Sequence, residues 1–313
     1  MEYRKLGSSG LDVSVVGLGT NNFGRRLDYE VSERVVLAAI DEGVNTIDTS
    51  NSYGDSLSEE YIGRALEGRR GEAVIATKVA SPRGDGPNSV GASRKHILDQ
   101  VEGSLRRLRT DHIDLYQIHF PDPATPIDET LRTLDDLVRS GKVRYIGCSN
   151  FAGWQLAQAM ERAIAVGSEP FASVQPPYSM LQRDIEKELV PCCEAYGVGI
   201  LPYFPLANGL LTGKYRRGQP APEGTRLGDD SPRAKATLGS ANYDVLEALE
   251  AFAADRGRTM VELAIAWLLA NPLVGSVIAG ATRTEQVKSN ASASGWHLSD
   301  EEPQELDDVL GEG

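Results

Sequence analysis

The chain has 313 residues, 41% of them hydrophobic and 25% charged, a composition typical of a globular protein with a large core. Its 32 basic and 45 acidic side chains give a formal net charge of −13, so its surface should repel phosphate backbones and we expect no nucleic-acid partner. The chain has only three cysteines and no signal-peptide pattern, and none of its apolar runs approaches the roughly 20 residues that span a bilayer. We therefore expect a cytoplasmic protein without a membrane partner.

A short hairpin is predicted first, at Tyr3–Leu6 and Leu11–Val13, and apolar runs then alternate with helix-like segments. The predicted strands are Val15–Leu18, Asn45–Ile47, Ala73–Ala76, Leu115–Ile118, Arg144–Gly147, Ala172–Val174, Gly199–Leu201 and Val274–Ile278. The predicted helices between them are Val31–Glu42, Leu57–Leu66, Arg94–Arg107, Ile127–Arg139, Gly153–Ala165, Ile185–Tyr196, Met260–Leu269 and Arg283–Ala293.

Eight strand–helix alternations predict parallel βαβ units, and closing eight of them gives a (β/α)8 TIM barrel. A doubly wound open sheet is the competing α/β architecture, and the count favours the barrel. We expect one domain over residues 1–313, with extra helices at Tyr243–Ala254 and Asp300–Leu310. Residues 207–240, after the seventh barrel strand, are rich in Gly, Pro, Arg and Asp; they predict a long loop without regular structure, typical of a lid or binding loop.

Polar residues follow nearly every predicted strand. In chain order they are Gly19-Thr20-Asn21, Asp48, Lys78, His119, Ser149-Asn150, Gln175, Tyr203 and Gly280. Any one of them is more often a cap or loop residue than a functional one. Barrel enzymes, however, carry their chemistry at the C-terminal ends of the strands, so the complete set indicates a shared site.

The segment at residues 45–54 suggests what that site does. Asp48 ends a buried strand, and Tyr53 follows five residues later beside a glycine. A tyrosine donates a proton effectively only if its pKa, about 10 in water, is brought toward working pH. Lys78 would supply the ammonium that does this, and Asp48 would hold that ammonium because a lone buried charge is too costly. The alternative is a surface lysine that snorkels to solvent.

No metal site is predicted. No two of the four histidines have the spacing of metal ligands, and the adjacent Cys192 and Cys193 have no histidine nearby in the sequence.

Ordered blocks over essentially the whole chain resemble the aldo-keto reductase superfamily, in its bacterial NADPH-dependent branch. The blocks are residues 3–7, 11–14, 17–20, Asp48 with Tyr53-Gly54, Thr77-Lys78, 117–119, 147–151, Gln175 with Tyr178, 203–206, 209–215 and 278–283. The resemblance implies a (β/α)8 oxidoreductase that uses NAD(P)H to reduce an aldehyde or ketone to an alcohol by hydride transfer. It leaves the oligomeric state open.

The resemblance also implies a catalytic tetrad of Asp48, Tyr53, Lys78 and His119. Tyr53 would be the general acid that protonates the oxygen of a small-molecule carbonyl substrate. Lys78 would lower the pKa of the tyrosine, Asp48 would anchor the lysine, and His119 would orient the carbonyl or help relay the proton.

The cofactor site implied by the resemblance comprises Gly19, Thr20, Asn21, Asp48, Ser149, Asn150, Gln175, Tyr203, Phe204, Pro205, Leu206, Gly209, Leu211, Lys214, Gly280, Thr282, Arg283, Gln286 and Asn290. Ser149, Asn150 and Gln175 would bind the carboxamide, and Tyr203 would stack on the nicotinamide ring. Gly209, Leu211 and Lys214 would form the pyrophosphate loop, and Gln286 and Asn290 would face the adenosine.

Arg283 opens a predicted helix, where the helix N-terminus and the guanidinium would both favour a 2′-phosphate. We therefore expect NADPH (NADP+) in preference to NADH. The family often has a proline where this chain has Ala279, and acidic residues where it has Lys288-Ser289. These departures weaken the support that the resemblance gives for NADPH over NADH.

Two other functions remain open from the sequence. One is a cofactor-binding regulatory subunit, like the potassium-channel β-subunits that share the fold. The other is an aldolase that forms a Schiff base on Lys78 and needs no nicotinamide. The tyrosine, the serine–asparagine pair and the glutamine argue against the aldolase.

Overall fold

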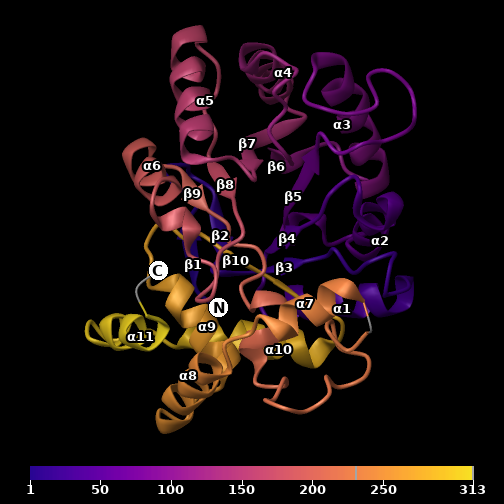
Figure 1. Ribbon diagram of the computed structural model, residues 1–313. Coiled ribbons are helices and arrows are strands. Elements are labelled where there is room, and N and C mark those ends of the chain that lie inside the picture. The colour runs from indigo at the N-terminus through magenta and orange to yellow at the C-terminus, as the bar shows by residue number, and fades with distance from the viewer. Residues whose placement is uncertain (230, 312–313) are drawn as a thin grey trace.

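The computed structural model describes residues 1–229 and 231–311, and its centre is a parallel eight-stranded sheet curled into a ring with helices outside it (Figure 1). The strand order is β10-β3-β4-β5-β6-β7-β8-β9. The strands are β3 Val16–Gly19, β4 Thr46–Asp48, β5 Val74–Val79, β6 Ile113–Ile118, β7 Val143–Ser149, β8 Ser173–Gln175, β9 Gly199–Ile200 and β10 Val277–Gly280.

The ring closes between β9 and β10. Parallel bridges join Ile200 to Val274 and Tyr203 to Ile278. Backbone hydrogen bonds follow the same line, from the Ile200 N–H to the Leu273 carbonyl at 2.8 Å and from the Ile278 N–H to the Pro202 carbonyl at 2.9 Å. This closure confirms the predicted (β/α)8 barrel and excludes the open sheet.

The helices cover the outside of the barrel, where most of the apolar core lies between them and the strands. They are α1 Tyr29–Asp41, α2 Leu57–Ala65, α3 Arg94–Leu108, α4 Ile127–Arg139, α5 Gly153–Val166, α6 Leu189–Tyr196, α9 Met260–Leu269 and α10 Thr284–Ser292, with α8 Tyr243–Asp255 and α11 Glu302–Leu310 as the two expected extra helices. Short 3-10 helices are η1 Tyr53–Ser56, η2 Arg70–Glu72, η3 Asp184–Glu186, η4 Ala207–Thr212 and η5 Ala293–Gly295.

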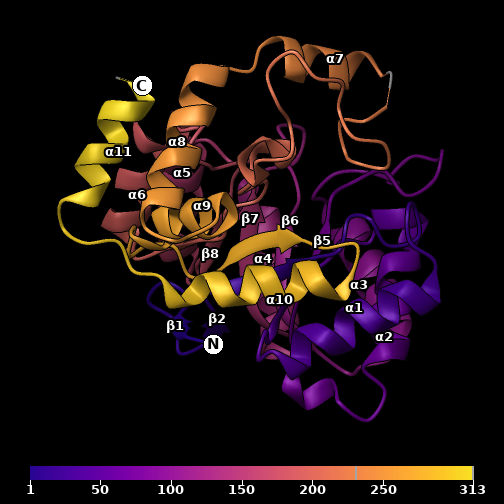
Figure 2. The same ribbon diagram turned by 90° about the horizontal axis from the view of Figure 1, so that it is seen from below.

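The N-terminal hairpin, β1 Tyr3–Lys5 and β2 Asp12–Ser14, covers the end of the barrel where the strands begin. Leu6 and Val13 are buried in a small apolar core with Leu115, Leu201 and Ile278. In Figure 2 this hairpin lies at one end of the barrel and α7 (Pro232–Gly239) lies beyond the other. The hairpin therefore covers one end of the barrel, and the loops that follow the strands surround the other end.

The prediction that residues 207–240 lack regular structure was wrong in part, because they contain η4 and α7. Ser231 caps α7 by accepting a hydrogen bond from the Ala234 N–H, and Pro232 occupies the first turn, where its missing N–H costs nothing. We call residues 213–229 the strap. It is tied down where the Tyr215 hydroxyl accepts from the Leu227 N–H at 3.1 Å.

Most observed strands finish later than predicted. β5 extends to Val79, so Lys78 lies within the strand and not after it. Among the described residues, none of the helices combines the length and the apolar character needed to cross a bilayer.

Candidate active site

Asp48 and Lys78 form a buried ion pair at the C-terminal ends of neighbouring strands, β4 and β5. The Lys78 Nζ lies 2.7 Å from each carboxylate oxygen of Asp48 and 2.8 Å from the Thr49 carbonyl, so its three protons meet three acceptors. Lys78 is 0% exposed and Asp48 3% exposed. A charge this deeply buried persists only with such a partner, so the snorkelling alternative is excluded.

The Lys78 ammonium is held in its charged form. Burial alone would lower the pKa of Lys78, but the Asp48 carboxylate and the nearby Tyr53 more than offset burial and raise this pKa above its ordinary value. Lys78 therefore remains a fixed positive charge at neutral pH.

Tyr53 lies beside this charge. Its ring centroid is 5.1 Å from the Lys78 Nζ. The chain then turns sharply, with left-handed backbone at Gly54, Asp55 and Ser56. A side chain on Gly54 would collide with the backbone of Phe23, so glycine is required for the close approach of these two loops.

Burial and the charges of Lys78 and Asp48 together set the acidity of Tyr53. Burial raises the pKa of its hydroxyl, the positive charge of Lys78 lowers it, and the negative charge of Asp48 raises it again. The balance is a pKa above the ordinary tyrosine value. The ammonium acts in the expected direction, but burial outweighs it in this state of the protein.

His119 follows β6 and packs against Tyr53, with ring centroids 6.0 Å apart in an edge-to-face arrangement. Its other neighbour, Phe120, stacks on it at 4.5 Å. The His119 Nδ1 lies 3.0 Å from the Ser81 Oγ and 3.3 Å from the Ser50 Oγ. Burial, together with the charge of Lys78, lowers the pKa of His119 to about 3, so the imidazole is neutral at physiological pH.

A hydrogen-bonded network connects the ends of β7, β8 and β9 to these groups. The Gln175 Nε2 donates to Asp48 at 2.8 Å. The Asn150 Nδ2 donates to the His119 carbonyl at 2.9 Å, and the Tyr203 hydroxyl donates to the Asn150 Oδ1 at 2.8 Å. The structure thus brings the predicted carboxamide-binding residues beside the predicted tetrad.

Strained backbone is concentrated at this end of the barrel. Nine non-glycine residues among those described have positive φ: Asp55, Ser56, Ala80, Asn88, Arg109, Asn150, Phe204, Ala207 and Asn208. All except Arg109 lie in the connections that follow barrel strands, with Asp55 and Ser56 inside η1 and Ala207 and Asn208 inside η4. Such conformations persist where the surrounding structure enforces them, and they cluster at functional sites.

The remaining predicted cofactor residues surround the ends of β3, β9 and β10. Gly19 is in register with Asp48 on one side and Gly280 on the other. The side chains of Thr20 and Leu211 are 0% exposed. The Thr20 hydroxyl donates to the Asp48 carbonyl at 2.9 Å, so this side chain holds strand ends together and is not open to a ligand.

The start of α10 carries the residues predicted for the adenosine end of a cofactor. Arg283 occupies the N-cap position with its side chain exposed. The Gln286 carboxamide accepts from both the N–H and the hydroxyl of Thr282, at 2.7 and 3.0 Å. Asn290 is buried, 6% exposed.

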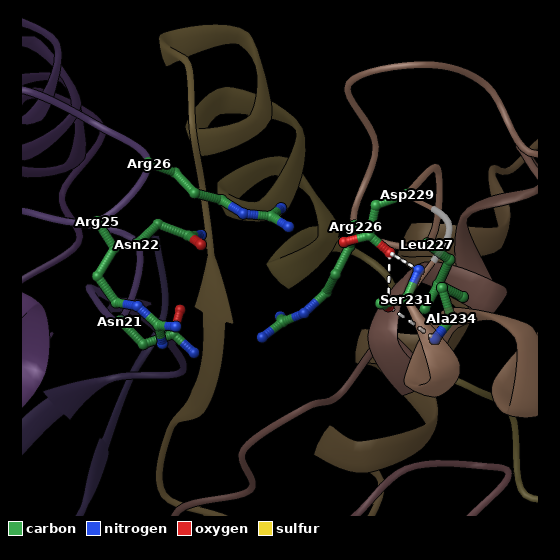
Figure 3. Close-up of a pocket in the computed structure, with 9 residues that line it drawn as sticks. All are labelled: Asn21, Asn22, Arg25, Arg26, Arg226, Leu227, Asp229, Ser231 and Ala234. Atoms are coloured by element: carbon green, nitrogen blue, oxygen red, sulfur yellow. Dashed lines mark hydrogen bonds between the residues drawn. The ribbon is translucent and has the colours of Figure 1, made fainter.

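A basic pocket of about 240 Å³ lies between the loop after β3 and the strap (Figure 3). The residues that line it are Asn21, Asn22, Arg25, Arg26, Arg226, Leu227, Asp229, Ser231 and Ala234. Arg26 and Arg226 extend from opposite walls into the space between the two segments. Three arginines and one aspartate line the pocket, in a chain of net charge −13, so the pocket suits a multiply charged anion.

Arg25, Arg26 and Arg226 were not among the predicted site residues. The sequence does carry a signal for Arg25 and Arg26, because this pair follows the first predicted barrel strand by only a few residues. Arg226 had no local signal, since its place opposite that pair depends on the path of the strap.

The fold and these strand-end residues are those of a (β/α)8 barrel enzyme with a buried lysine–aspartate pair beside a tyrosine. A family model described as aldo/keto reductase family matches residues 15–310. The chain belongs to the aldo/keto reductase family, and membership implies NAD(P)H-dependent reduction of carbonyl compounds.

Three relatives show the range of proteins to which the chain is similar. It is 35% identical to the aldo-keto reductase YhdN of Bacillus subtilis, over 99% of this chain and 94% of that protein. It is 34% identical to the L-glyceraldehyde 3-phosphate reductase of Escherichia coli K12, over 100% and 93%. It is 36% identical to a probable voltage-gated potassium channel subunit beta of Oryza sativa, over 94% and 91%.

Proposed function

We propose that this protein is an NADPH-dependent reductase that converts an aldehyde or ketone to an alcohol, with Tyr53 as the general acid. One observation carries the proposal: Tyr53 lies beside the buried ammonium of Lys78, which Asp48 fixes in place. The nicotinamide, when bound, supplies the hydride.

In this proposal Tyr53 gives its proton to the substrate oxygen as negative charge develops there. Its raised pKa keeps the hydroxyl protonated before reaction, and the Lys78 charge stabilises the phenolate left after proton transfer. Asp48 takes no direct part in the proton transfer. It keeps Lys78 charged and oriented, with Gln175 hydrogen-bonded to the same carboxylate.

His119 completes the site as a neutral group. The imidazole lies against the Tyr53 ring and would orient the carbonyl oxygen by a hydrogen bond, without adding a second positive charge beside Lys78. The exposed ring of Phe120, stacked on His119, would form part of the substrate entrance.

The residues present fit a dinucleotide cofactor. Ser149, Asn150 and Gln175 offer amide and hydroxyl groups for the carboxamide end beside the proposed tetrad, and the Tyr203 ring would stack on the nicotinamide. The basic pocket of Figure 3 offers charge for the diphosphate, so we add Arg25, Arg26 and Arg226 to the cofactor residues.

NADPH is proposed over NADH because of Arg283. Its exposed guanidinium stands at the N-terminus of α10, where the charge of the arginine and the positive end of the helix dipole both favour a 2′-phosphate.

A regulatory, cofactor-binding role is the second candidate, favoured by the similarity to a channel subunit beta. The aldolase alternative fits poorly. A Schiff-base lysine attacks as the neutral amine, whereas the Lys78 ammonium donates hydrogen bonds to three acceptors, two of them the carboxylate oxygens of Asp48, and its pKa is raised.

Titrating NADPH and NADH against intrinsic fluorescence, followed by a screen of aldehydes, diketones and pyridoxal for NADPH consumption, tests the proposal. Tight NADPH binding with turnover of a carbonyl supports the reductase. Tight binding with no turnover of any carbonyl would favour the regulatory role, and no nicotinamide binding would contradict both.

A further inference from the structure

Ser81 reaches the site through an unusual backbone conformation. It stands two residues after the end of β5, and the intervening Ala80 has φ of 94°, which an alanine rarely adopts. The turn is held by a hydrogen bond from the Gly91 N–H to the Ala80 carbonyl at 3.1 Å. As a result the Ser81 side chain, 6% exposed, meets His119 on the neighbouring strand end.

The neutral ring of His119 carries its proton on only one of two nitrogens. If Nε2 carries it, Nδ1 accepts a hydrogen bond and Nε2 donates one. If Nδ1 carries it, the lone pair of Nε2 is left to face any ligand oxygen, and this contact is repulsive. The tautomer therefore decides whether His119 attracts or repels a carbonyl oxygen at Nε2.

The two serine hydroxyls near Nδ1 differ in their other partners. The Ser50 Oγ lies 3.0 Å from the Ser52 hydroxyl and accepts from the Ser52 N–H at 3.3 Å. Across the described residues, the Ser81 Oγ has the His119 Nδ1 as its single hydrogen-bond partner, at 3.0 Å. A buried hydroxyl proton without an acceptor is costly, so the Ser81 O–H donates to Nδ1.

We propose that Ser81 is a positioning residue: its hydroxyl, turned inward by Ala80, fixes His119 as the tautomer protonated on Nε2. The imidazole is thereby held ready to donate a hydrogen bond to a carbonyl oxygen. That last step rests on the function proposed above, whereas the tautomer itself does not.

Nitrogen-15 NMR of uniformly labelled protein reads the tautomer directly, because protonated and unprotonated ring nitrogens have well-separated shifts. The His119 signals are identified by their loss in His119→Gln. We expect an unprotonated Nδ1 and a protonated Nε2 in the wild type. Ser81→Ala should shift both signals toward an average of the two tautomers, and Ser50→Ala, the matched change at the longer contact, should leave them in place.

Activity provides the second readout. Ser81→Ala should lower kcat/KM for the carbonyl about tenfold, the size of one lost hydrogen bond, while the NADPH affinity stays unchanged. Ser81→Thr keeps the hydroxyl and should restore both the tautomer and the rate.

A wild-type spectrum with Nδ1 protonated would overturn the proposal, and so would wild-type shifts in Ser81→Ala. If Ser81→Ala does not fold, the wild-type and Ser81→Thr spectra still decide it. If no carbonyl is turned over, the proposed function fails, but the NMR result judges Ser81 independently.

Discussion

Both carboxylate oxygens of Asp48 lie 2.7 Å from the Lys78 Nζ, and solvent reaches neither side chain appreciably. Removing one partner of such a pair leaves an uncompensated buried charge. We expect Asp48→Ala and Lys78→Met each to lower the free energy of unfolding by about 3–5 kcal/mol, measured by urea denaturation without cofactor.

The double variant Asp48→Asn/Lys78→Met is the control for this pair, because it removes both charges and should recover much of the lost stability. Losses below about 1 kcal/mol in the single variants, the range of exposed ion pairs, would contradict the burial seen here.

Tyr53→Phe removes the hydroxyl that is the proposed acid and leaves the ring unchanged. We expect kcat to fall by about 10²–10⁴-fold, the usual contribution of a positioned acid, with NADPH affinity nearly unchanged. Steady-state kinetics and fluorescence titration measure the two quantities. Tyr29→Phe, on the outer helix α1, is the matched control; comparable turnover in Tyr53→Phe and wild type would remove Tyr53 as the acid.

The neutral His119 makes stability depend on pH. The folded-state pKa is about 3, whereas an unfolded histidine titrates near 6.5, so between these values the unfolded chain binds a proton that the folded one does not. The contribution of neutral His119 to the free energy of unfolding is fully present above pH about 6.5. It is lost as the pH falls toward about 3, at a rate of at most about 1.4 kcal/mol per pH unit. Urea unfolding of wild type and His119→Gln between pH about 7 and 5 should show the steeper loss in the wild type. Parallel curves would mean that His119 is already charged in the folded protein.

Arg283→Ala should weaken NADPH binding by about 10–100-fold and leave NADH binding nearly unchanged, because only NADPH carries the 2′-phosphate. Titration of both cofactors measures the difference. Lys288→Ala removes the same charge further along α10 and should discriminate far less. Equal weakening of both cofactors by Arg283→Ala would show that this arginine does not read the phosphate.

Arg26→Ala and Arg226→Ala should each raise the dissociation rate of NADPH about tenfold, since each removes one charged wall of the basic pocket. Stopped-flow displacement measures this rate. Arg34→Ala on α1 gives the same change in net charge away from the pocket. If all three variants release cofactor equally fast, the general field of the protein and not the pocket is responsible.

Much of the barrel was predictable because alternation of apolar strands and amphipathic helices persists through the chain, and α4 and α9 begin and end at the predicted residues. Some predicted helix boundaries were wrong even though the sequence carries a signal for the observed ones. α1 begins at Tyr29 and not Val31, although Asp28 is a good N-cap whose carboxylate accepts from the Val31 N–H. Likewise, Ser231-Pro232 is a helix-start signal for α7 inside the segment predicted to be a loop.

The site was predictable to the level of which residues gather at the strand ends, since parallel strands bring these ends together. Their energetics were not. Burial outweighs the charge of Lys78 in setting the pKa of Tyr53 because the tyrosine ring is deeply buried. The contact between Ser81 and His119 requires a positive φ at Ala80. Neither property is encoded in local sequence pattern.

Pairing of β3 with β10 has a consequence for how this protein folds. The first barrel strand along the chain is hydrogen-bonded to the last, with Val16 in register with Val277. During synthesis from the N-terminus, the open edge of β3 therefore stays without its neighbour until Val277–Gly280 has emerged. Contacts so distant in sequence are slow to form, and an unpaired strand edge invites pairing with other chains. Pairing with β10 is thus the step that removes the exposed edge of β3.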